Sequence, residues 1–465
     1  MPDPILPDFS NPFKNFKNMT EREIMIEIGQ ISGDESGDDD IGFNTALILS
    51  GKKVPQLLDK VLLDFKDKIS SKYFTIYEDQ LRVILANLYE INSIQESLYI
   101  FYSRDTTEYK QSKRYNPNGV SIRPLKFLID NLKEHGWINH IGGHYDKKTE
   151  TGRRSRMRPS KKLLQAFYDF KVKAKYVHRS LIEEIRLKNS QKKLIEYKDT
   201  PTTNLMRNKL RSYNSLLYRI RIKLKRNKKV CSYLETHPTN FNDKQYFRVF
   251  NDSSFELGGR FYGPWWISPS KDIRKYITLD DEKTVELDYS SLGIHLLYSK
   301  ENLSYYDLHE PTADPYTLKG VDSTEREVNK KIITFALNML PEDKKSRYVF
   351  TVRQKIKKLN EEISLMGGKK LLKVPTGKEI WRRLSLFEEE NAPIKHYLFK
   401  KVGKELQYKD SCIAESIIER MLTMKIPILA IHDSFIVQHW NRDLLYTSMN
   451  YIFKKHKLKS IPIIK

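Results

Sequence analysis

Two aspartates in this chain end apolar, strand-like runs, and each would need a compensating cation. Asp433 lies in the middle of residues 428–437 (Ile-Leu-Ala-Ile-His-Asp-Ser-Phe-Ile-Val), which predict a buried β-hairpin with one carboxylate at its tip. Asp288 ends the alternating run 284–288 and precedes small polar residues and an expected helix. A buried carboxylate is costly unless it is paired or binds a metal, and Mg²⁺ prefers oxygen ligands. The two aspartates therefore predict a shared metal site.

Each of these segments also has an ordinary structural interpretation. An isolated His-Asp-Ser is usually a plain hairpin turn. Asp288 alone is equally well a helix N-cap, because its carboxylate accepts hydrogen bonds from free backbone amides. Only the combination of two strand-end aspartates with further segments favours a catalytic site.

The combination resembles motifs A and C of the palm in the DNA polymerase I family and in the single-subunit RNA polymerases of bacteriophages and mitochondria. Residues 326–338 (Arg-Glu-Val-Asn-Lys-Lys-Ile-Ile-Thr-Phe-Ala-Leu-Asn) resemble motif B, the fingers helix that grips the incoming nucleotide. Residues 256–260 (Glu-Leu-Gly-Gly-Arg) are similar to the Gly-Arg motif that contacts the nascent duplex. The four segments occur in the family's order and cover roughly the C-terminal half of the chain.

The resemblance implies an α+β right-hand polymerase, with palm, fingers and thumb, that adds nucleotides by two-metal chemistry. Asp288 and Asp433 would hold two Mg²⁺ ions, or Mn²⁺ in their place, with the Tyr289 backbone carbonyl as an additional ligand. Arg260 would contact the duplex. His432 would touch the primer terminus, although a satisfied turn histidine is an equally good interpretation.

Four residues of the expected fingers helix recur at every fourth position and share one slowly drifting face. Arg326 and Lys330 would meet the triphosphate, because the leaving pyrophosphate needs cations placed in advance. Thr334 and Asn338 would lie further along, toward the sugar and base. Taken alone, the two basic residues are an ordinary solvated helix face.

Departures from the family pattern affect the expected substrate. Asn338 stands where the family usually has Tyr, and Met339 follows where it has Gly, so base stacking and sugar rejection are in question. Gly293 stands where the DNA polymerases carry a Glu that excludes a ribose hydroxyl. Because the RNA polymerases also have Gly there, and because His-Asp-Ser resembles their motif C, we expect ribonucleotides to fit.

Composition supports a nucleic-acid partner. The 465 residues include 82 Lys and Arg against 59 Asp and Glu, a net charge of +23, and the stretch 221–229 concentrates this charge. Only two cysteines are present, without metal-ligand spacing, and no apolar stretch is long enough for a membrane span. We therefore expect a cytoplasmic protein that binds a DNA template and nucleoside triphosphates; the sequence leaves its oligomeric state open.

The chain is predicted to divide into four parts. Residues 1–70 form an N-terminal segment, partly mobile, with an acidic loop at 33–40; residues 71–168 resemble a winged helix whose basic return strand carries Arg154 and Arg156. Residues 169–245 are expected to be a helical, thumb-like region, and 246–465 the palm and fingers. A basic hairpin that only packs on the palm is the alternative to the winged helix.

The predicted function is template-directed nucleotidyl transfer, as a DNA-dependent RNA polymerase, primase or primase-polymerase, in replication or transcription of a mobile element. The alternative is a DNA-binding replication initiator or regulator whose palm does not catalyse.

Overall fold

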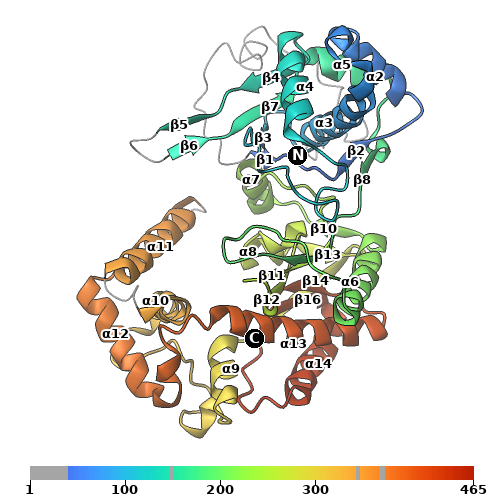
Figure 1. Cartoon of the computed structure of the whole chain (residues 1–465). Coiled ribbons are helices and arrows are strands. Elements are labelled where there is room, and N and C mark those ends of the chain that lie inside the picture. Colours follow the sequence, from blue (N-terminus) through green and yellow to red (C-terminus); the bar gives the residue numbers. More distant parts are fainter. Residues whose placement is uncertain (1–39, 147–150, 342–345, 366–371) are drawn as a thin grey trace, which may run out of the picture. The chain divides into compact units, whose positions relative to one another are not determined.

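A computed structural model describes residues 40–146, 151–341, 346–365 and 372–465 (Figure 1). Helices and strands are mixed throughout, so the chain is α+β, as predicted. Residues 33–39 of the expected acidic loop lie outside the described residues. The chain forms two compact units: unit 1 is Met1–Glu183 with Leu234–Asn240, and unit 2 is Glu184–Tyr233 with Phe241–Lys465. The four-part division, with boundaries near 70, 168 and 245, differs from these units and stays a prediction.

Unit 1 contains four α-helices and eight strands among its described residues. In chain order they are β1 (Ile41–Gly42), β2 (Leu47–Leu49), α2 (Val54–Leu62), α3 (Phe74–Ile94), β3 (Ile100–Tyr102), α4 (Ile122–Glu134), β4 (Ile138–Ile141), β5 (His144–Asp146), β6 (Thr151–Arg153), β7 (Ser155–Pro159), α5 (Lys161–Asp169) and β8 (Val177–Arg179).

A small sheet and its covering helices build the core of unit 1. The sheet has the order β1-β3-β7-β4, and β5 and β6 form a separate two-stranded hairpin between β4 and β7. The apolar faces of α3 and α4 lie in one buried cluster with the sheet. α4 ends shortly before Gly136, which adopts the left-handed φ of +70° that a helix C-terminus favours.

Unit 2 contains the segments that resemble the polymerase motifs. Its elements are β9 (Ile185–Leu187), α6 (Pro201–Arg219), β10 (Ile222–Leu224), α7 (Lys228–Thr236, which ends in unit 1), β11 (Phe247–Asn251), β12 (Ser254–Tyr262), α8 (Lys271–Arg274), β13 (Ile277–Leu279), β14 (Glu282–Asp288), α9 (Leu292–Lys300), α10 (Arg326–Asn338), α11 (Ser346–Leu365), α12 (Gly377–Glu390), α13 (Gly403–Thr423), β15 (Leu429–Ile431), β16 (Ser434–Gln438) and α14 (Arg442–Lys455).

Two sheets organise unit 2. The larger has the order β10-β13-β14-β16-β15, and the smaller has the order β12-β11-β9. α13 packs along β12, and α14 contacts β14 and β16 (Figure 1). Helices α10, α11 and α12 gather around a second core of buried side chains (Figure 1). The sheets can thus hold one set of residues rigidly while the three helices present another.

The structure corrects one element prediction. The sequence predicts a helical region over residues 169–245, but β8, β9 and β10 lie in this range beside α6 and α7. Ile222 and Leu224 are buried and Lys223 is exposed, which is the alternation of a strand, and all three pair with β13. α6 begins at Pro201 because Thr200 caps it.

Candidate active site

Neighbouring strand ends bring Asp288 and Asp433 together. The register of β14 against β16 places Asp288 directly opposite Ser434, the residue after Asp433. His432 and Asp433 form the tight turn between β15 and β16. The backbone N–H of Tyr289 donates to the Asp433 carbonyl at 3.3 Å. The two carboxylates expected to share a metal therefore arise from adjacent backbone positions.

The pKa of Asp288 is strongly raised. Burial, followed by the charge of Asp433, raises this pKa to about 7, whereas the charges of Lys271 and Lys330 act in the opposite direction. A divalent cation beside Asp288 would favour its ionised form.

The donor chemistry suits a hard cation. In the described ranges, no group of three or more His, Cys, Asp or Glu side chains is arranged to hold a metal ion. Mg²⁺ does not require such a group, because it usually rests on one or two carboxylates and takes its other ligands from water and substrate phosphates. The pair Asp288 and Asp433 fits that requirement.

A buried ion pair supports the Asp433 turn from the β14 side. Glu286 lies two residues before Asp288, hence on the same face of the strand, and accepts a hydrogen bond from Ser434 Oγ at 2.7 Å. Arg274 donates to both carboxylate oxygens of Glu286, at 2.6 and 3.0 Å. These contacts fix the turn that carries Asp433 relative to the end of β14.

Arg260 is anchored by an aspartate that the sequence analysis did not single out. Its Nε and Nη2 donate to Oδ2 of Asp410, at 2.6 and 2.5 Å. Asp410 lies on α13 and is only 3% exposed. Burial raises the Asp410 pKa, Arg260 opposes this shift, and the Asp433 charge reinforces it. Arg260 and Asp410 thus lie close enough to Asp433 to share its electrostatic environment.

The two glycines before Arg260 are required by the backbone. Gly258 and Gly259 have φ of +82° and +75°, in the left-handed region that disfavours side chains. A Cβ on Gly259 would lie 2.7 Å from the Phe250 ring and 2.9 Å from Ser411 Oγ. Only glycine lets this irregular part of β12 lie close enough to α13 for Arg260 to reach Asp410.

His432 occupies a strained position at the turn. Its φ of +57° is left-handed, which costs a non-glycine residue about 1 kcal/mol. Burial and the neighbouring Arg260 lower its pKa to about 4, so the ring is neutral near pH 7. The edge of the ring contacts Tyr262, and its Nδ1 is buried without a hydrogen-bond partner among the described residues. The ring is therefore not fully satisfied within the described chain, and a primer contact by His432 stays a prediction.

The last residues of the chain pair with the segment that carries Asp288. Asp288 and Lys465 exchange two backbone hydrogen bonds of 3.0 Å, and Ser290 N–H donates to the Ile463 carbonyl at 2.8 Å. Ser460 anchors this segment, because its Oγ bonds His295 Nδ1 at 2.8 Å. The backbone that presents Asp288 is thus held on one side by β16 and on the other by residues 463–465.

Two basic residues of α10, Arg326 and Lys330, differ in their partners. Arg326 Nε and Nη2 donate to Asp314 at 2.9 and 2.8 Å, and Nη1 donates to Glu327. Lys330 is exposed, has no ion-pair partner in the part of the chain that the structure describes, and lies close enough to lower the Asp288 pKa. Lys330 is therefore available to a ligand near the aspartates, and so is Lys271, which is also exposed and lowers the Asp288 pKa.

The remaining predicted nucleotide contacts also lie in unit 2. Thr334 and Asn338 are exposed on α10, and Asn338 Nδ2 donates to the Thr334 carbonyl at 2.7 Å. Gly293 lies in the first turn of α9, and a Cβ there would meet only Leu406 Cδ1, at 3.9 Å. Glycine at 293 is thus required neither by packing nor by the backbone.

Some of the site residues that were not predicted, namely Asp410 and Glu286, carry a signal in the local sequence. Asp410 precedes Ile413 and Ile417 at helical spacing on an apolar face, and a carboxylate at such a position suggests a buried partner. Glu286 alternates with Asp288 along one strand. Nothing local marks residues 463–465 or Lys271, because their proximity to Asp288 depends on long-range folding.

The two arginines predicted in unit 1 have different environments. Arg156 is buried, pairs with Asp40 at 3.1 Å and lies over Tyr99. Arg154 has a half-exposed side chain, lies over Phe101 and pairs with Glu108 at 3.5 Å. A nucleic-acid contact by Arg156 would require this buried pair to open, whereas Arg154 remains accessible.

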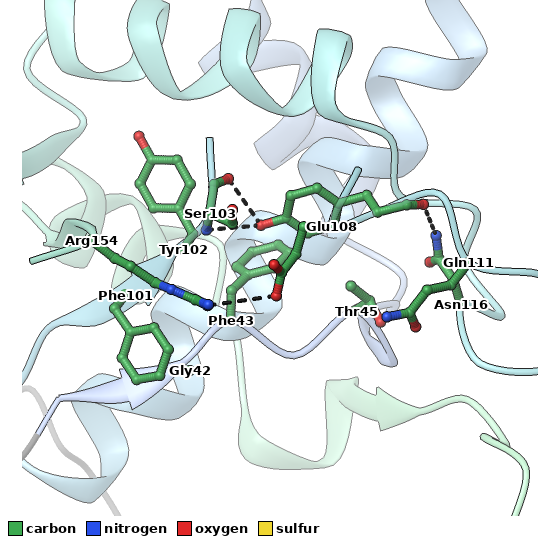
Figure 2. Close-up of a pocket in the computed structure, with 11 residues that line it drawn as sticks. Gly42, Phe43, Thr45, Phe101, Tyr102, Ser103, Glu108, Gln111, Asn116 and Arg154 are labelled. Atoms are coloured by element: carbon green, nitrogen blue, oxygen red, sulfur yellow. Dashed lines mark hydrogen bonds and ion pairs between the residues drawn. The ribbon is translucent and has the colours of Figure 1, made fainter. Parts of the chain in front are cut away.

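Arg154 also lines a pocket of about 270 Å³ (Figure 2). The ion pair with Glu108 lies at its wall, and aromatic rings provide much of the remaining lining. The lining residues are Gly42, Phe43, Thr45, Phe101, Tyr102, Ser103, Glu108, Tyr109, Gln111, Asn116 and Arg154.

Comparisons with known proteins give limited information. No family model and no curated protein matches the chain. Among solved structures, it is similar to the POL domain of Pol1 from M. smegmatis, in a complex with DNA primer-template and dNTP, at 10% identity and a TM-score of 0.25. The match covers 91% of this chain and 66% of that one, so the chain spans slightly less than two thirds of the matched chain's length. These values are too low to assign an activity. Within the described ranges, no helix combines the length and apolar character of a membrane span.

Proposed function

We propose that unit 2 is a template-directed nucleotidyltransferase of the DNA-dependent RNA polymerase, primase or primase-polymerase type. It would act in the replication or transcription of a mobile element. The observation that carries the proposal is the register of β14 and β16, which sets Asp288 beside the turn that holds Asp433. Paired carboxylates on rigid strands are suited to phosphoryl chemistry, in which charge must be positioned before reaction.

The arrangement of elements supports a right-hand assignment. The sheet β10-β13-β14-β16-β15 would be the palm, and α10, α11 and α12 the fingers. Residues 169–245 would supply the thumb, and unit 1 a winged helix.

The chain's own residues would bind and orient the reactants. Asp288 and Asp433, with the Tyr289 carbonyl, would hold Mg²⁺ or Mn²⁺. When bound, two such ions stabilise the attacking and leaving oxygens of an in-line displacement. Lys330 would meet the triphosphate, and Arg326 would join it, oriented by Asp314.

The product strand would lie beside Arg260 and His432. A guanidinium has five N–H donors, and Asp410 receives bonds from two of its nitrogens, so Arg260 retains donors for a nucleic-acid acceptor. His432 Nδ1 offers a further unsatisfied position.

The test is nucleotide incorporation on primed and unprimed DNA templates with Mg²⁺, using NTPs or dNTPs. Asp433→Asn and Asp288→Asn should each reduce incorporation by roughly 100-fold or more, because each removes a ligand charge from a step in which metals contribute several kcal/mol. Asp443→Asn is the matched control, because Asp443 has a 92% exposed side chain. Wild-type incorporation that both site variants retain would refute the assignment.

A charged helix face in unit 1 supports a second candidate, a DNA-binding replication initiator or regulator. Arg123, Lys126 and Lys133 are exposed on one face of α4, and none has an ion-pair partner among the described residues. The acidic neighbour on that face, Asp130, is bonded by Arg104 through both oxygens at 3.0 Å. A cationic helix followed by a β-hairpin can enter a major groove and contact phosphates. If this were the only function, biological activity would survive Asp288→Asn and Asp433→Asn.

A further inference from the structure

Helix α11 has one buried face and one cationic face. Tyr348, Val352 and Ile356 recur at every fourth position and are fully buried in the core that α11 shares with α10 and α12. Tyr348 also donates from its hydroxyl to the Ile332 carbonyl of α10 at 2.9 Å. The helix is therefore fixed against α10, which carries Lys330.

The opposite face combines an aromatic ring with uncompensated positive charge. Phe350 is 63% exposed, and Arg353 and Lys357 follow it at one-turn spacings on the same side. Lys355 and Lys358 flank this face and are exposed too. None of these four cations has an ion-pair partner within the described ranges.

The local sequence explains the absence of ion pairs. Residues 346–360 contain no Asp or Glu, so neither Arg353 nor Lys355 has an acidic residue one turn away on α11. Glu361 is the first exposed acid on the same side, one turn beyond Lys357. An ordinary solvated helix would mix charges of both signs, and a lone surface phenylalanine would need no explanation. An exposed phenylalanine among cations that have no ion-pair partner in the described residues is the combination that single-stranded nucleic acids bind, through base stacking and phosphate contacts.

We propose that the face formed by Phe350, Arg353 and Lys357 binds single-stranded DNA. Phe350 stacks on a base, and Arg353 and Lys357, about 6 Å apart along the helix axis, contact phosphates of the same strand. The proposal that this strand is the unpaired template ahead of the reaction site rests on the proposed function. The proposal that the face binds single-stranded DNA does not. Duplex DNA is a poor ligand for this face, because its bases are already stacked on one another and cannot stack on Phe350.

The test compares two DNA substrates that differ only in a single-stranded extension of the template strand. Binding is measured by fluorescence anisotropy without nucleotides, so no catalysis is needed. Phe350→Ala should weaken binding of the extended substrate roughly tenfold and leave the blunt duplex unchanged. Arg353→Gln with Lys357→Gln should weaken it too and lower the salt slope by about 0.7 for each phosphate that is no longer neutralised. The matched control is Tyr446→Ala with Lys454→Gln and Lys455→Gln, an exposed aromatic and two exposed lysines on α14.

The outcomes separate this inference from the proposed function. Equal affinity of the α11 variants and wild type for the extended substrate would overturn the inference, whether or not nucleotides are incorporated. Equal losses on extended and blunt substrates would also overturn it, because they would indicate general electrostatic attraction. If the α11 variants lose affinity only for the extended substrate, and the wild type incorporates no nucleotides, the inference is supported and the polymerase assignment is refuted.

Discussion

The backbones of Asp288 and Lys465 form two hydrogen bonds of 3.0 Å, with one N–H donated by each residue. Residues separated by most of unit 2 thus form a short antiparallel pair at the end of the strand that carries the candidate metal ligand. The position of the Asp288 backbone is thereby fixed from both sides.

Removing one of these bonds should slow nucleotide incorporation. Lys465→Pro deletes the N–H that donates to the Asp288 carbonyl, whereas Lys465→Ala retains it. We expect the proline variant to lose roughly tenfold in single-turnover rate, because an unpaired backbone group costs about 1–3 kcal/mol and loosens Asp288. Identical rates for the two variants would show that this pairing does not position Asp288.

The sugar preference should depend on residue 293. Gly293→Glu should lower incorporation of ribonucleotides relative to deoxyribonucleotides, because the new side chain occupies space that a Cβ enters freely up to Leu406 Cδ1 at 3.9 Å. Gly293→Ala is the control and should fold as stably as the wild type or slightly better, since glycine within a helix costs about 1 kcal/mol. The measurement is competition between a labelled NTP and its dNTP. An unchanged ratio in the Glu variant would exclude Gly293 from the sugar site.

The Asp288 carboxyl should make stability depend on pH and on Mg²⁺. Its folded pKa of about 7 exceeds its ordinary 3.8, so the folded chain binds this proton more tightly than the unfolded chain. The resulting stability is present below about pH 4 and is lost as the pH rises toward 7. Asp288→Asn should therefore raise the Tm at pH 8 and leave it nearly unchanged at pH 4.

Mg²⁺ provides the complementary measurement. At pH 8 it should raise the Tm of the wild type, because a ligand that binds only the folded state stabilises it. The Asp288→Asn and Asp433→Asn variants should respond much less. A Mg²⁺ effect of the same size in all three proteins would place the bound ion elsewhere.

The features that could be predicted from the sequence are those encoded within a few neighbouring residues. The apolar run that ends in Asp288 predicted a strand, and the run around Asp433 predicted a β-hairpin. The structure contains this strand and this hairpin, because alternation and turn chemistry are encoded within a few residues. The ion pair Arg260–Asp410 could not be predicted in the same way, since its members are 150 positions apart. The helical prediction for residues 169–245 is wrong at β10, because Ile222-Lys223-Leu224 is too short to show strand periodicity inside a basic stretch.

The ion pair of Arg274 with Glu286 should be worth more to stability than an ordinary surface pair. The two side chains are only 13% and 9% exposed, so Arg274→Met leaves a buried carboxylate without its cation. We expect a loss of about 3–5 kcal/mol in the free energy of unfolding, measured by urea denaturation. Adding Glu286→Gln to Arg274→Met should restore part of this loss, because the unpaired charge is gone. No recovery in the double variant would indicate that packing, and not charge, sets the cost.

The exposed cations of α4 should control binding of duplex DNA by unit 1. Replacing Arg123, Lys126 and Lys133 by Gln should weaken duplex binding and lower the slope of log K against log salt by about 0.9 for each phosphate that the helix no longer neutralises. Nucleotide incorporation at saturating template should stay the same, because none of these residues belongs to unit 2. The control replaces three exposed lysines elsewhere in unit 1, Lys53, Lys171 and Lys173, and keeps the net charge equal. An equal salt slope in the two triple variants would mean that net charge alone attracts DNA; a lower slope only in the α4 variant would identify this helix as the element that binds the duplex.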